Sequence, residues 1–339
     1  MVPHLLRKAF WKRPSHMSVS GMSTERADVE DVRYAYRLLL GRLPDPQGLE
    51  TCTRLVRDQV LTPFELAERF LGSNEFHSRY KTEPVEVNLG SHVLVVRADD
   101  TDVGRAVATT RQWEPHVVTV LHRYLQPGGR FLDVGANIGY FTAWAAHRVG
   151  SAGRVVAVEP MDKNAQLIYA TVARNGFTQV RVEPFAASDA AGVICMGTHP
   201  GTSNGEILGE GSHGGSLLYA QACRLDDRLA GESRFDVVKF DIEGHELHAW
   251  RGFSRTLERE RPIVLTEFHP HCLRRNAKIE PEVYGAVLLN YGTVTVLHFD
   301  GRHSACQDIE TLMRLWASED AALGTDGTAH LDLLVEPRY

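Results

Sequence analysis

The middle of the chain alternates short apolar segments with stretches of helical periodicity. Five apolar segments are predicted to be β-strands, at 131–134, 155–158, 180–182, 237–240 and 263–266. Helical patterns separate most of them, at 142–149, 164–175 and 246–257. Parallel strands need such crossover helices, which cover both faces of the sheet. The pattern therefore predicts an α/β fold with a doubly wound, mostly parallel sheet.

The sheet is expected to have seven strands in a Rossmann-like arrangement. Two further strands are predicted near the C-terminus, at 293–299 and 330–335, with a helical insert around 308–323. A glycine- and serine-rich stretch within 191–225 is expected to be a long link. Its loop at 197–216 is either a tolerated insertion or a lid over the site.

Three parts of the chain differ in composition. We predict a basic flexible tail, a small all-α domain and one large α/β domain, at residues 1–22, 23–82 and 83–339. The large domain is expected to have a β-rich lead-in at 85–114 and a core at 115–339. The tail mixes basic and apolar residues, so weak contact with a membrane surface is an alternative to a solvated tail.

The all-α domain is predicted from apolar residues at helical spacing. Val29, Val32 and Tyr36 recur on one face of the first helix. A proline-rich turn at 44–46 leads into a second helix. Pro63 is well placed at the first position of a third helix, which we expect to begin without a capping box.

The charge and cysteine content exclude several classes of protein. Acidic residues outnumber basic ones, 43 to 37, for a formal charge of −6, whereas nucleic-acid-binding domains are normally basic. The five cysteines form no CxxC pair, so we expect reduced thiols and a cytoplasmic protein. No apolar stretch approaches the ~18 residues of a transmembrane helix. We expect neither a nucleic-acid partner nor a membrane span.

The segment FLDVGANIGYF ends the first predicted strand and begins a helix. Asp133 closes the strand, and Gly135, Asn137 and Gly139 form a tight turn that a ligand can approach closely. The dinucleotide fingerprint needs a third glycine where Tyr140 stands. A carboxylate before the loop is poorly suited to a pyrophosphate, but it suits the cationic groups of S-adenosylmethionine. The loop therefore favours S-adenosylmethionine over NAD.

Two neighbouring strand ends offer places for an adenosine. Glu159 follows the second strand in VVAVEP, where a carboxylate can accept both hydroxyls of a ribose; a solvated turn glutamate is the alternative. Ala187 ends the third strand in EPFAASD, where small side chains leave room for an adenine ring. Ser188 and Asp189 could then reach the amino group of the adenine. Small residues at a strand end are also ordinary core packing.

Acidic groups and imidazoles gather after the fourth and fifth strands. FDVVKFDIEGHE places Asp241 and His245 after one strand, and PIVLTEFHP places Glu267 and His269 after the next. Such groups repel one another unless a proton or a cation shares the site, so we interpret them as the reaction centre. Asp241 and Glu267 could hold a divalent cation, but Phe268 adds no oxygen ligand, and no metal is expected.

These segments together resemble the FkbM family of methyltransferases. FLDVGANIGYFTAWAAHRVGSAGRVVAVEP, VVKFDIEGHELHAWRG and RPIVLTEFHP match in order and spacing, and the resemblance runs from about residue 85 to the C-terminus. It implies an S-adenosylmethionine-dependent enzyme that methylates oxygen on sugars or polyketide products. By position, it implies that the methionine end of the cofactor is held by Asp133, Gly135, Asn137 and Gly139. It also implies that Glu159 holds the ribose and that Asp241 lines the methyl side.

A second resemblance concerns the N-terminal helices. YRLLLGRLPDPQGLE, followed by ERFLGSNEFHSRY, resembles a small helical domain of unknown function that is often attached to glycan-acting enzymes. It favours a sugar or glycan acceptor. An O-methyltransferase for a small secondary metabolite and a non-catalytic cofactor-binding scaffold remain alternatives. The presence of Asp133, Gly135 and Asp241 argues against the scaffold.

The expected reaction is methyl transfer to a hydroxyl group. A hydroxyl is a weak nucleophile that must lose its proton as the new bond forms. His269 is the first candidate for the base, because the pKa of an imidazole is close to neutral. Glu267 is the second, as the base or as the group that orients the imidazole, and His245 is the third. We expect Asp241, Glu267 and His269 to converge in one pocket.

Overall fold

The computed structural model describes residues 26–40, 42–71, 73, 75, 84–97, 99–198, 201–207, 216–232 and 234–338. The chain divides into two compact units, Met1–Thr82 and Glu83–Tyr339. The predicted tail at 1–22 lies outside the described residues. In the described part of the chain, no helix combines the length and apolarity needed to cross a membrane.

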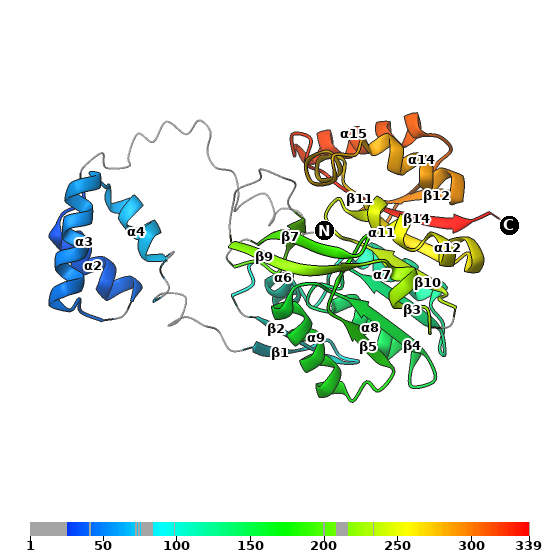
Figure 1. The fold of residues 1–339 in the computed structure, drawn as a ribbon, viewed down its shortest axis with the longest axis horizontal. Coiled ribbons are helices and arrows are strands. Elements are labelled where there is room, and N and C mark those ends of the chain that lie inside the picture. The colour runs from blue at the N-terminus through cyan, green and yellow to red at the C-terminus, as the bar shows by residue number, and fades with distance from the viewer. Residues whose placement is uncertain are drawn as a thin grey trace. The chain divides into compact units, whose positions relative to one another are not determined.

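The first unit is helical (Figure 1). Its described helices are α2 (Val29–Leu39), α3 (Pro46–Gln59) and α4 (Pro63–Leu71). Val32, Tyr36 and Phe70 are buried between them, and the rings of Tyr36 and Phe70 meet edge to face at 4.9 Å. The helical spacing seen in the sequence therefore buries Val32 and Tyr36 on one face of α2, whereas Val29, the first residue of the helix, is exposed.

Side chains close the starts of these helices. Asp45 caps α3 by accepting from the amide of Gly48 at 2.8 Å. The expectation that the third helix begins without a capping box is wrong. Thr62 Oγ1 accepts from the amide of Glu65 at 3.3 Å, and the carboxylate of Glu65 accepts from the amide of Thr62 at 2.8 Å. A threonine followed three residues later by a glutamate is the capping-box signature, and the sequence contains it.

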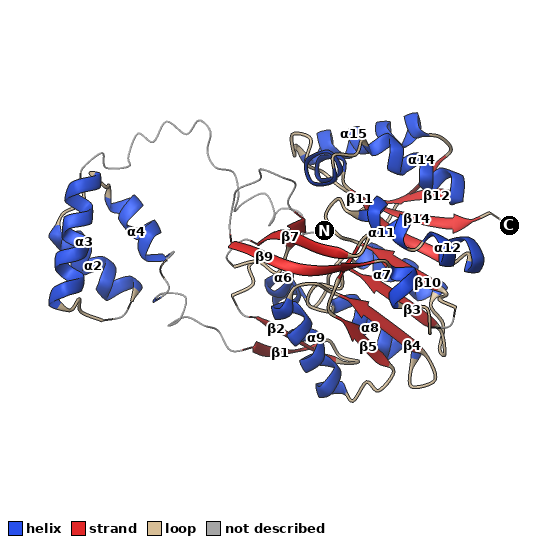
Figure 2. Ribbon diagram, viewed as in Figure 1, coloured by secondary structure: helices blue, strands red, loops and turns tan. Residues whose placement is uncertain are grey.

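The described part of the second unit is built on an eight-stranded sheet (Figure 2). Its strands, from edge to edge, are β13 (His303–Cys306), β12 (Gly292–Leu297), β14 (Leu331–Pro337), β11 (Ile263–Phe268), β10 (Val237–Phe240), β3 (Arg130–Val134), β4 (Arg154–Val158) and β5 (Val180–Glu183). The five strands from β11 to β5 are parallel, and β14, β12 and β13 pair antiparallel. The predicted doubly wound, mostly parallel fold is confirmed.

Both faces of the sheet are buried. Neighbouring residues of one strand enter different apolar clusters, as Phe131 and Leu132 do on β3, and Val237 and Val238 on β10. This period of two is what a strand covered on both faces requires. The covering helices are α6 (Val103–Thr110), α7 (Pro115–Tyr124), α8 (Tyr140–Val149), α9 (Asp162–Asn175), α10 (Leu225–Arg228), α11 (Glu246–Gly252), α12 (Ser254–Glu260), α14 (Pro281–Tyr291) and α15 (Ile309–Leu323). Figure 1 shows α14 beside β12 and β14.

Three local features differ from the prediction. The eighth strand, β13, arises because the chain turns back at Gly301, whose φ is +86°, and pairs with β12. The predicted helix at 246–257 is divided into α11 and α12, and a Cβ at Gly252 would overlap the carbonyl oxygen of Ser188. The lead-in contains the hairpin of β1 (Pro84–Asn88) and β2 (Val93–Arg97), followed by α6, a helix that was not predicted.

A smaller sheet occupies much of the region predicted as a long link. In the described residues, its order is β6 (Ala186–Ala187), β9 (Ser216–Cys223), β7 (Gly192–Thr198) and β8 (Gly205–Ile207). Met196 and Ala220 point to one side of it and pack with Met161. The glycines and serines masked this alternation in the sequence. The predicted loop at 197–216 includes 199–200 and 208–215, which lie outside the described residues.

Candidate cofactor and active site

The predicted site residues lie at one edge of the main sheet. Asp133, Glu159, Asp241 and Glu267 stand at or just beyond the carboxyl ends of β3, β4, β10 and β11. Their charges act on one another: Asp133 on Glu159, and Asp241 on both Asp133 and Glu267. In doubly wound sheets, ligands bind beyond this edge.

The turn after β3 is shaped by backbone contact with β10. Gly135 has a φ of +85°, and a Cβ there would overlap the carbonyl oxygen of Asp241. Asn137 and Gly139 also have positive φ, +50° and +87°, and Gly139 precedes the first residue of α8. We expected Gly135 to make room for a ligand. In the structure, the glycine also makes room for the protein's own backbone.

Asp133 is buried and only partly satisfied. Its Oδ2 accepts from Thr142 Oγ1 at 2.6 Å, whereas Oδ1 has no hydrogen-bond partner among the described residues. Burial raises the pKa of Asp133, and the nearby Lys239 opposes this rise. A buried carboxylate oxygen without a donor is costly, and a cationic donor from a ligand would satisfy it. The residue thus fits the ammonium group proposed for it.

Glu159 is held by the loop it faces. Its two carboxylate oxygens each accept a backbone amide at 2.8 Å, one from Asn137 and one from Met161. Burial raises the pKa of Glu159 to about 8. Each carboxylate oxygen can accept a second hydrogen bond, so the pair could still take two ribose hydroxyls. The alternative of a solvated turn glutamate does not fit a side chain that is 4% exposed.

A segment from the smaller sheet reaches the cofactor loop. Asn204 accepts from Asn137 Nδ2 at 2.8 Å and donates to Asp102 Oδ2 at 2.6 Å. Asn164, at the start of α9, donates to the carbonyl of Ser203 at 2.8 Å. Asn204 was not predicted as a site residue, because nothing in a glycine-rich stretch indicates which residue will meet a loop 67 positions earlier.

Lys239 is a buried charge that the sequence analysis did not assign. Its Nζ lies 2.6 Å from Asp241 Oδ2 and 4.6 Å from the ring centre of Phe141. It also acts electrostatically on Asp133. A lysine inside the otherwise apolar strand VVKF was the signal available for it, since lysine is almost never buried without a partner.

Glu267 lies among other carboxyl groups. Burial raises its pKa, and the charges of Asp241, Glu243 and Glu246 raise it further. His330 Nδ1 lies 3.5 Å from Glu267 Oε1. From the sequence, His330 was predicted only to begin a strand. Its position beside a strand end became visible only with the antiparallel pairing of β11 and β14.

The two predicted histidines lie in different surroundings. His269 lies near Glu243 and Cys272, and its ring centre is 6.0 Å from that of His330. His245 Nε2 is 3.1 Å from Ser188 Oγ, and its ring stacks on His248 at 4.3 Å.

Burial and the nearby His248 lower the pKa of His245 to about 3, so this imidazole is neutral near pH 7. Its partners belong to the edge near β6, whereas His269 neighbours the Glu267 end of the sheet.

Ala187 packs in the apolar core with Phe185 and Leu247. This is the packing role given above as the alternative to an adenine contact. Asp189 pairs with His248, the Nδ1–Oδ2 distance being 2.9 Å, and Ser188 pairs with His245.

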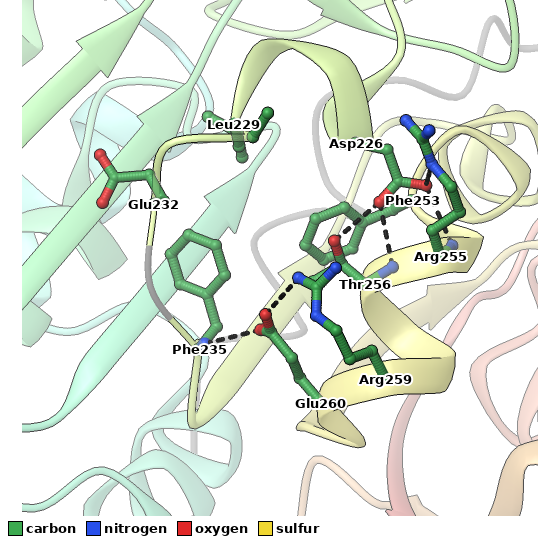
Figure 3. A pocket seen from close by; sticks show the side chains of 10 residues that line it. Asp226, Leu229, Glu232, Phe235, Phe253, Arg255, Thr256, Arg259 and Glu260 are labelled. Atoms are coloured by element: carbon green, nitrogen blue, oxygen red, sulfur yellow. Dashed lines mark hydrogen bonds and ion pairs between the residues drawn. The ribbon is translucent and has the colours of Figure 1, made fainter.

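A pocket of about 220 Å³ lies elsewhere in the same unit (Figure 3). Its wall includes Phe235, whose amide donates to Glu260 Oε2 at 3.2 Å, just before the start of β10. Asp226 in the same wall accepts from Thr256 and Arg255. The pocket therefore lies toward the amino end of β10, away from the edge where doubly wound sheets bind ligands.

Comparison with known proteins gives a family for this unit. The family profile described as "Methyltransferase FkbM domain" matches residues 133–301, about half of the chain. A second profile, for protein-L-isoaspartate(D-aspartate) O-methyltransferases, matches residues 75–189. The FkbM profile covers the turn after β3, the turn at 241–246 after β10 and the end of β11.

The curated relatives share only parts of their length with this chain. AMB antimetabolite synthetase AmbE of Pseudomonas aeruginosa is 31% identical over 180 residues, which are 42% of this chain and 8% of that protein. Protein-L-isoaspartate O-methyltransferase 1 of Arabidopsis thaliana is 45% identical over 49 residues, 13% of this chain and 21% of that protein. The chain thus spans a small part of either relative.

Solved methyltransferase structures align at low identity. A methyltransferase FkbM from Methylobacillus flagellatus is 15% identical with a TM-score of 0.38, and the alignment covers 89% of this chain and 58% of that one. The O-methyltransferase TomG from Streptomyces achromogenes, solved in complex with S-adenosylmethionine, is 16% identical with a TM-score of 0.31. That alignment covers 66% of this chain and 78% of TomG. The family profile, and not these alignments, confirms the resemblance read from the sequence: the chain belongs to the FkbM family of methyltransferases.

Proposed function

We propose that the chain transfers a methyl group from S-adenosylmethionine to a hydroxyl of a sugar or glycan. The observation that carries the cofactor assignment is the unpartnered Oδ1 of Asp133, which faces no donor among the described residues. Bound S-adenosylmethionine would supply an activated methyl group on a sulfonium. Asp133 would bind its ammonium group, Glu159 its ribose, and Asp241 would line the methyl side.

The protein's own part in the reaction is to align the acceptor and exclude water. We propose that His269 acts on the acceptor hydroxyl, with Glu267 and His330 beside it. Asp241 forms an ion pair with Lys239, whose Nζ lies 2.6 Å from Asp241 Oδ2, and this contact fixes the position of the carboxylate. His245 is a weaker candidate for this role, because its Nε2 is hydrogen-bonded to Ser188, the residue that follows β6.

We expect calorimetry to show binding of S-adenosylmethionine and of its demethylated product, and no binding of NAD. Asp133→Asn should weaken cofactor binding about 10- to 100-fold, because it removes a charge-assisted hydrogen bond worth roughly 1.5–3 kcal/mol. Asp236→Asn is the matched control, since Asp236 accepts from the amide of Arg130 at the opposite edge of the sheet. NAD binding without S-adenosylmethionine binding would contradict the assignment.

Cofactor affinity is expected to rise with pH. Because the pKa of Glu159 is raised to about 8 in the free protein, its carboxyl is largely protonated at pH 6 and ionised above pH 8. Ribose hydroxyls donate to the ionised form, so binding releases a proton below pH 8. The dissociation constant should fall by up to about tenfold per pH unit between pH 6 and 8 and then level off. Glu159→Gln should remove this pH dependence of the dissociation constant. If the variant keeps an equal pH dependence, a group other than Glu159 causes it.

We propose that the first unit is an accessory domain and that cofactor binding belongs to residues 83–339. The two units have separate apolar cores. A chain lacking residues 1–82 should therefore keep its dissociation constant for S-adenosylmethionine within about twofold. Aggregation, or loss of cofactor binding, would show that the helices complete the second unit.

The acceptor class is tested with labelled S-adenosylmethionine. Methyl label should appear in a polysaccharide fraction of the host rather than in a small-molecule extract. The second candidate, a small secondary metabolite, is favoured by the 31% identity to an antimetabolite synthetase. Label in the extract would support that candidate. A chain that binds the cofactor but labels neither fraction would support a non-catalytic scaffold.

A further inference from the structure

Three potential metal ligands meet near the end of β11. In the described part of the chain, Glu243, His269 and Cys272 each offer one ligand atom, and these atoms lie within 4.8 Å of one another. We call these residues the Glu243 cluster. Glu243 belongs to the turn after β10, His269 follows β11, and Cys272 ends α13 (Pro270–Cys272). His269 and Cys272 therefore lie three residues apart in the turn after β11, and the folded chain brings Glu243 to them from the turn after β10.

The backbone of Glu243 is positioned from several sides. Glu243 and Gly244 have positive φ values, +55° and +96°, and a Cβ at Gly244 would overlap the backbone of Cys272. Glu246 Oε1 accepts the amides of Ile242 and Gly244 at 3.0 and 3.1 Å. A non-glycine residue with positive φ is uncommon, and such residues collect at functional sites.

The other side of the cluster is equally constrained. Asn276 Nδ2 donates to the carbonyl of Glu243 at 2.8 Å and so ties the turn to the segment after Cys272. That segment is the π-helix η1 (Leu273–Ala277), a form that is rare and often found at functional sites. The amide of Cys272 donates to His269 Nδ1 at 3.4 Å. This bond is long, so little is lost if the imidazole turns to a cation.

The donor set indicates the kind of cation. A carboxylate, an imidazole and a thiolate suit zinc and similar divalent transition metals, whereas magnesium and calcium prefer oxygen ligands. Metal–ligand bonds of about 2.0–2.3 Å in a tetrahedron place donor atoms roughly 3.3–3.5 Å apart. Cys272 Sγ and Glu243 Oε2 are already 3.8 Å apart. Three protein ligands with an open fourth position are typical of catalytic zinc sites.

We propose that the Glu243 cluster binds one divalent transition metal ion of the zinc class. This site differs from the Asp241 and Glu267 pair considered from the sequence, which lacked a third ligand. The cluster's role, which rests on the proposed function, is to offer the open position to the acceptor oxygen. With the cation bound, His269 acts on the acceptor as a metal ligand rather than as a base, and the proton of the hydroxyl passes to Glu267. A cation there lowers the pKa of a bound hydroxyl.

Cobalt is the probe for the site, because a thiolate bound to cobalt gives a near-ultraviolet charge-transfer band. The full-length protein, freed of metal by dialysis against a chelator, should bind one equivalent of cobalt with that band, and zinc should displace it. Cys272→Ser should abolish the band, and His269→Gln and Glu243→Gln should weaken cobalt binding at least about 100-fold. Cys306→Ser is the matched control, since Cys306 is also buried but lies in β13.

Two results would overturn the proposal: a wild-type protein that takes up no stoichiometric cobalt, or a band that survives in Cys272→Ser. Retained binding of S-adenosylmethionine by Cys272→Ser shows that this variant is folded. A protein that binds S-adenosylmethionine but no cobalt refutes the metal site alone. A protein that binds cobalt but no S-adenosylmethionine refutes the proposed function and leaves the metal site standing.

Discussion

Replacing His269 with alanine is expected to lower turnover by a factor of about 10²–10⁴ and to leave the affinity for S-adenosylmethionine nearly unchanged. The imidazole follows β11 beside Glu243 and Cys272, at the end of the sheet where the acceptor is proposed to bind. The cofactor is proposed to rest on Asp133 and Glu159, at the ends of β3 and β4. The loss should therefore appear in kcat and not in cofactor binding.

The measurement uses labelled S-adenosylmethionine with the acceptor fraction that takes up the label. His271→Ala is the matched control, because His271 is exposed and its ring centre is 6.2 Å from that of His269. We expect its turnover to stay within about twofold of wild type. If His269→Ala behaves like this control and His330→Ala carries the loss, the group acting on the acceptor is His330.

Replacing Gly135 with alanine is the change expected to damage the second unit most. The added Cβ would overlap the carbonyl oxygen of Asp241, and alanine would have to adopt a φ of +85°. Backbone strain and overpacking each cost about 1–3 kcal/mol. The free energy of unfolding should fall by about 2–4 kcal/mol, and cofactor binding should be lost because the loop beside Asp133 must move.

Gly128→Ala separates the two causes. Gly128 also has a positive φ, +79°, but a Cβ there would meet nothing within 4 Å. This variant should therefore show the backbone term alone, about 1 kcal/mol in denaturant unfolding. If the two variants lose the same free energy of unfolding, the overlap with Asp241 is relieved by a backbone shift that costs no stability.

The sheet could be predicted because its strands are apolar on both faces. The segment 237–240 was predicted to be a strand and is β10 in the structure. The smaller sheet could not be predicted, since the residues that border its strands are glycines and serines, which are typical of loops. The same limit applies to β13, which depends on a turn at Gly301 rather than on a hydrophobic pattern.

The candidate site was predictable where it follows strand ends and not where it depends on turns. Asp133, Glu159, Asp241 and Glu267 were found from their positions after apolar segments. Cys272 was not, because a single cysteine in the segment HPHC gives no sign that a turn with positive φ at Glu243 will meet it. Cys272 and Glu243 are close because the backbones of the turns after β10 and β11 pack together, and residue types alone do not specify this packing.

The close approaches at Gly135 and Gly244 have a consequence for how such enzymes can diversify. Gly135 lies against the backbone of Asp241, and Gly244 lies against the backbone of Cys272. The turns after the neighbouring strands β3, β10 and β11 are therefore stacked backbone against backbone. An insertion or deletion in any of them would disturb the other two. We therefore expect the lengths of the three turns to tolerate little change, so that a shift in the proposed acceptor preference would have to arise in segments outside this stack.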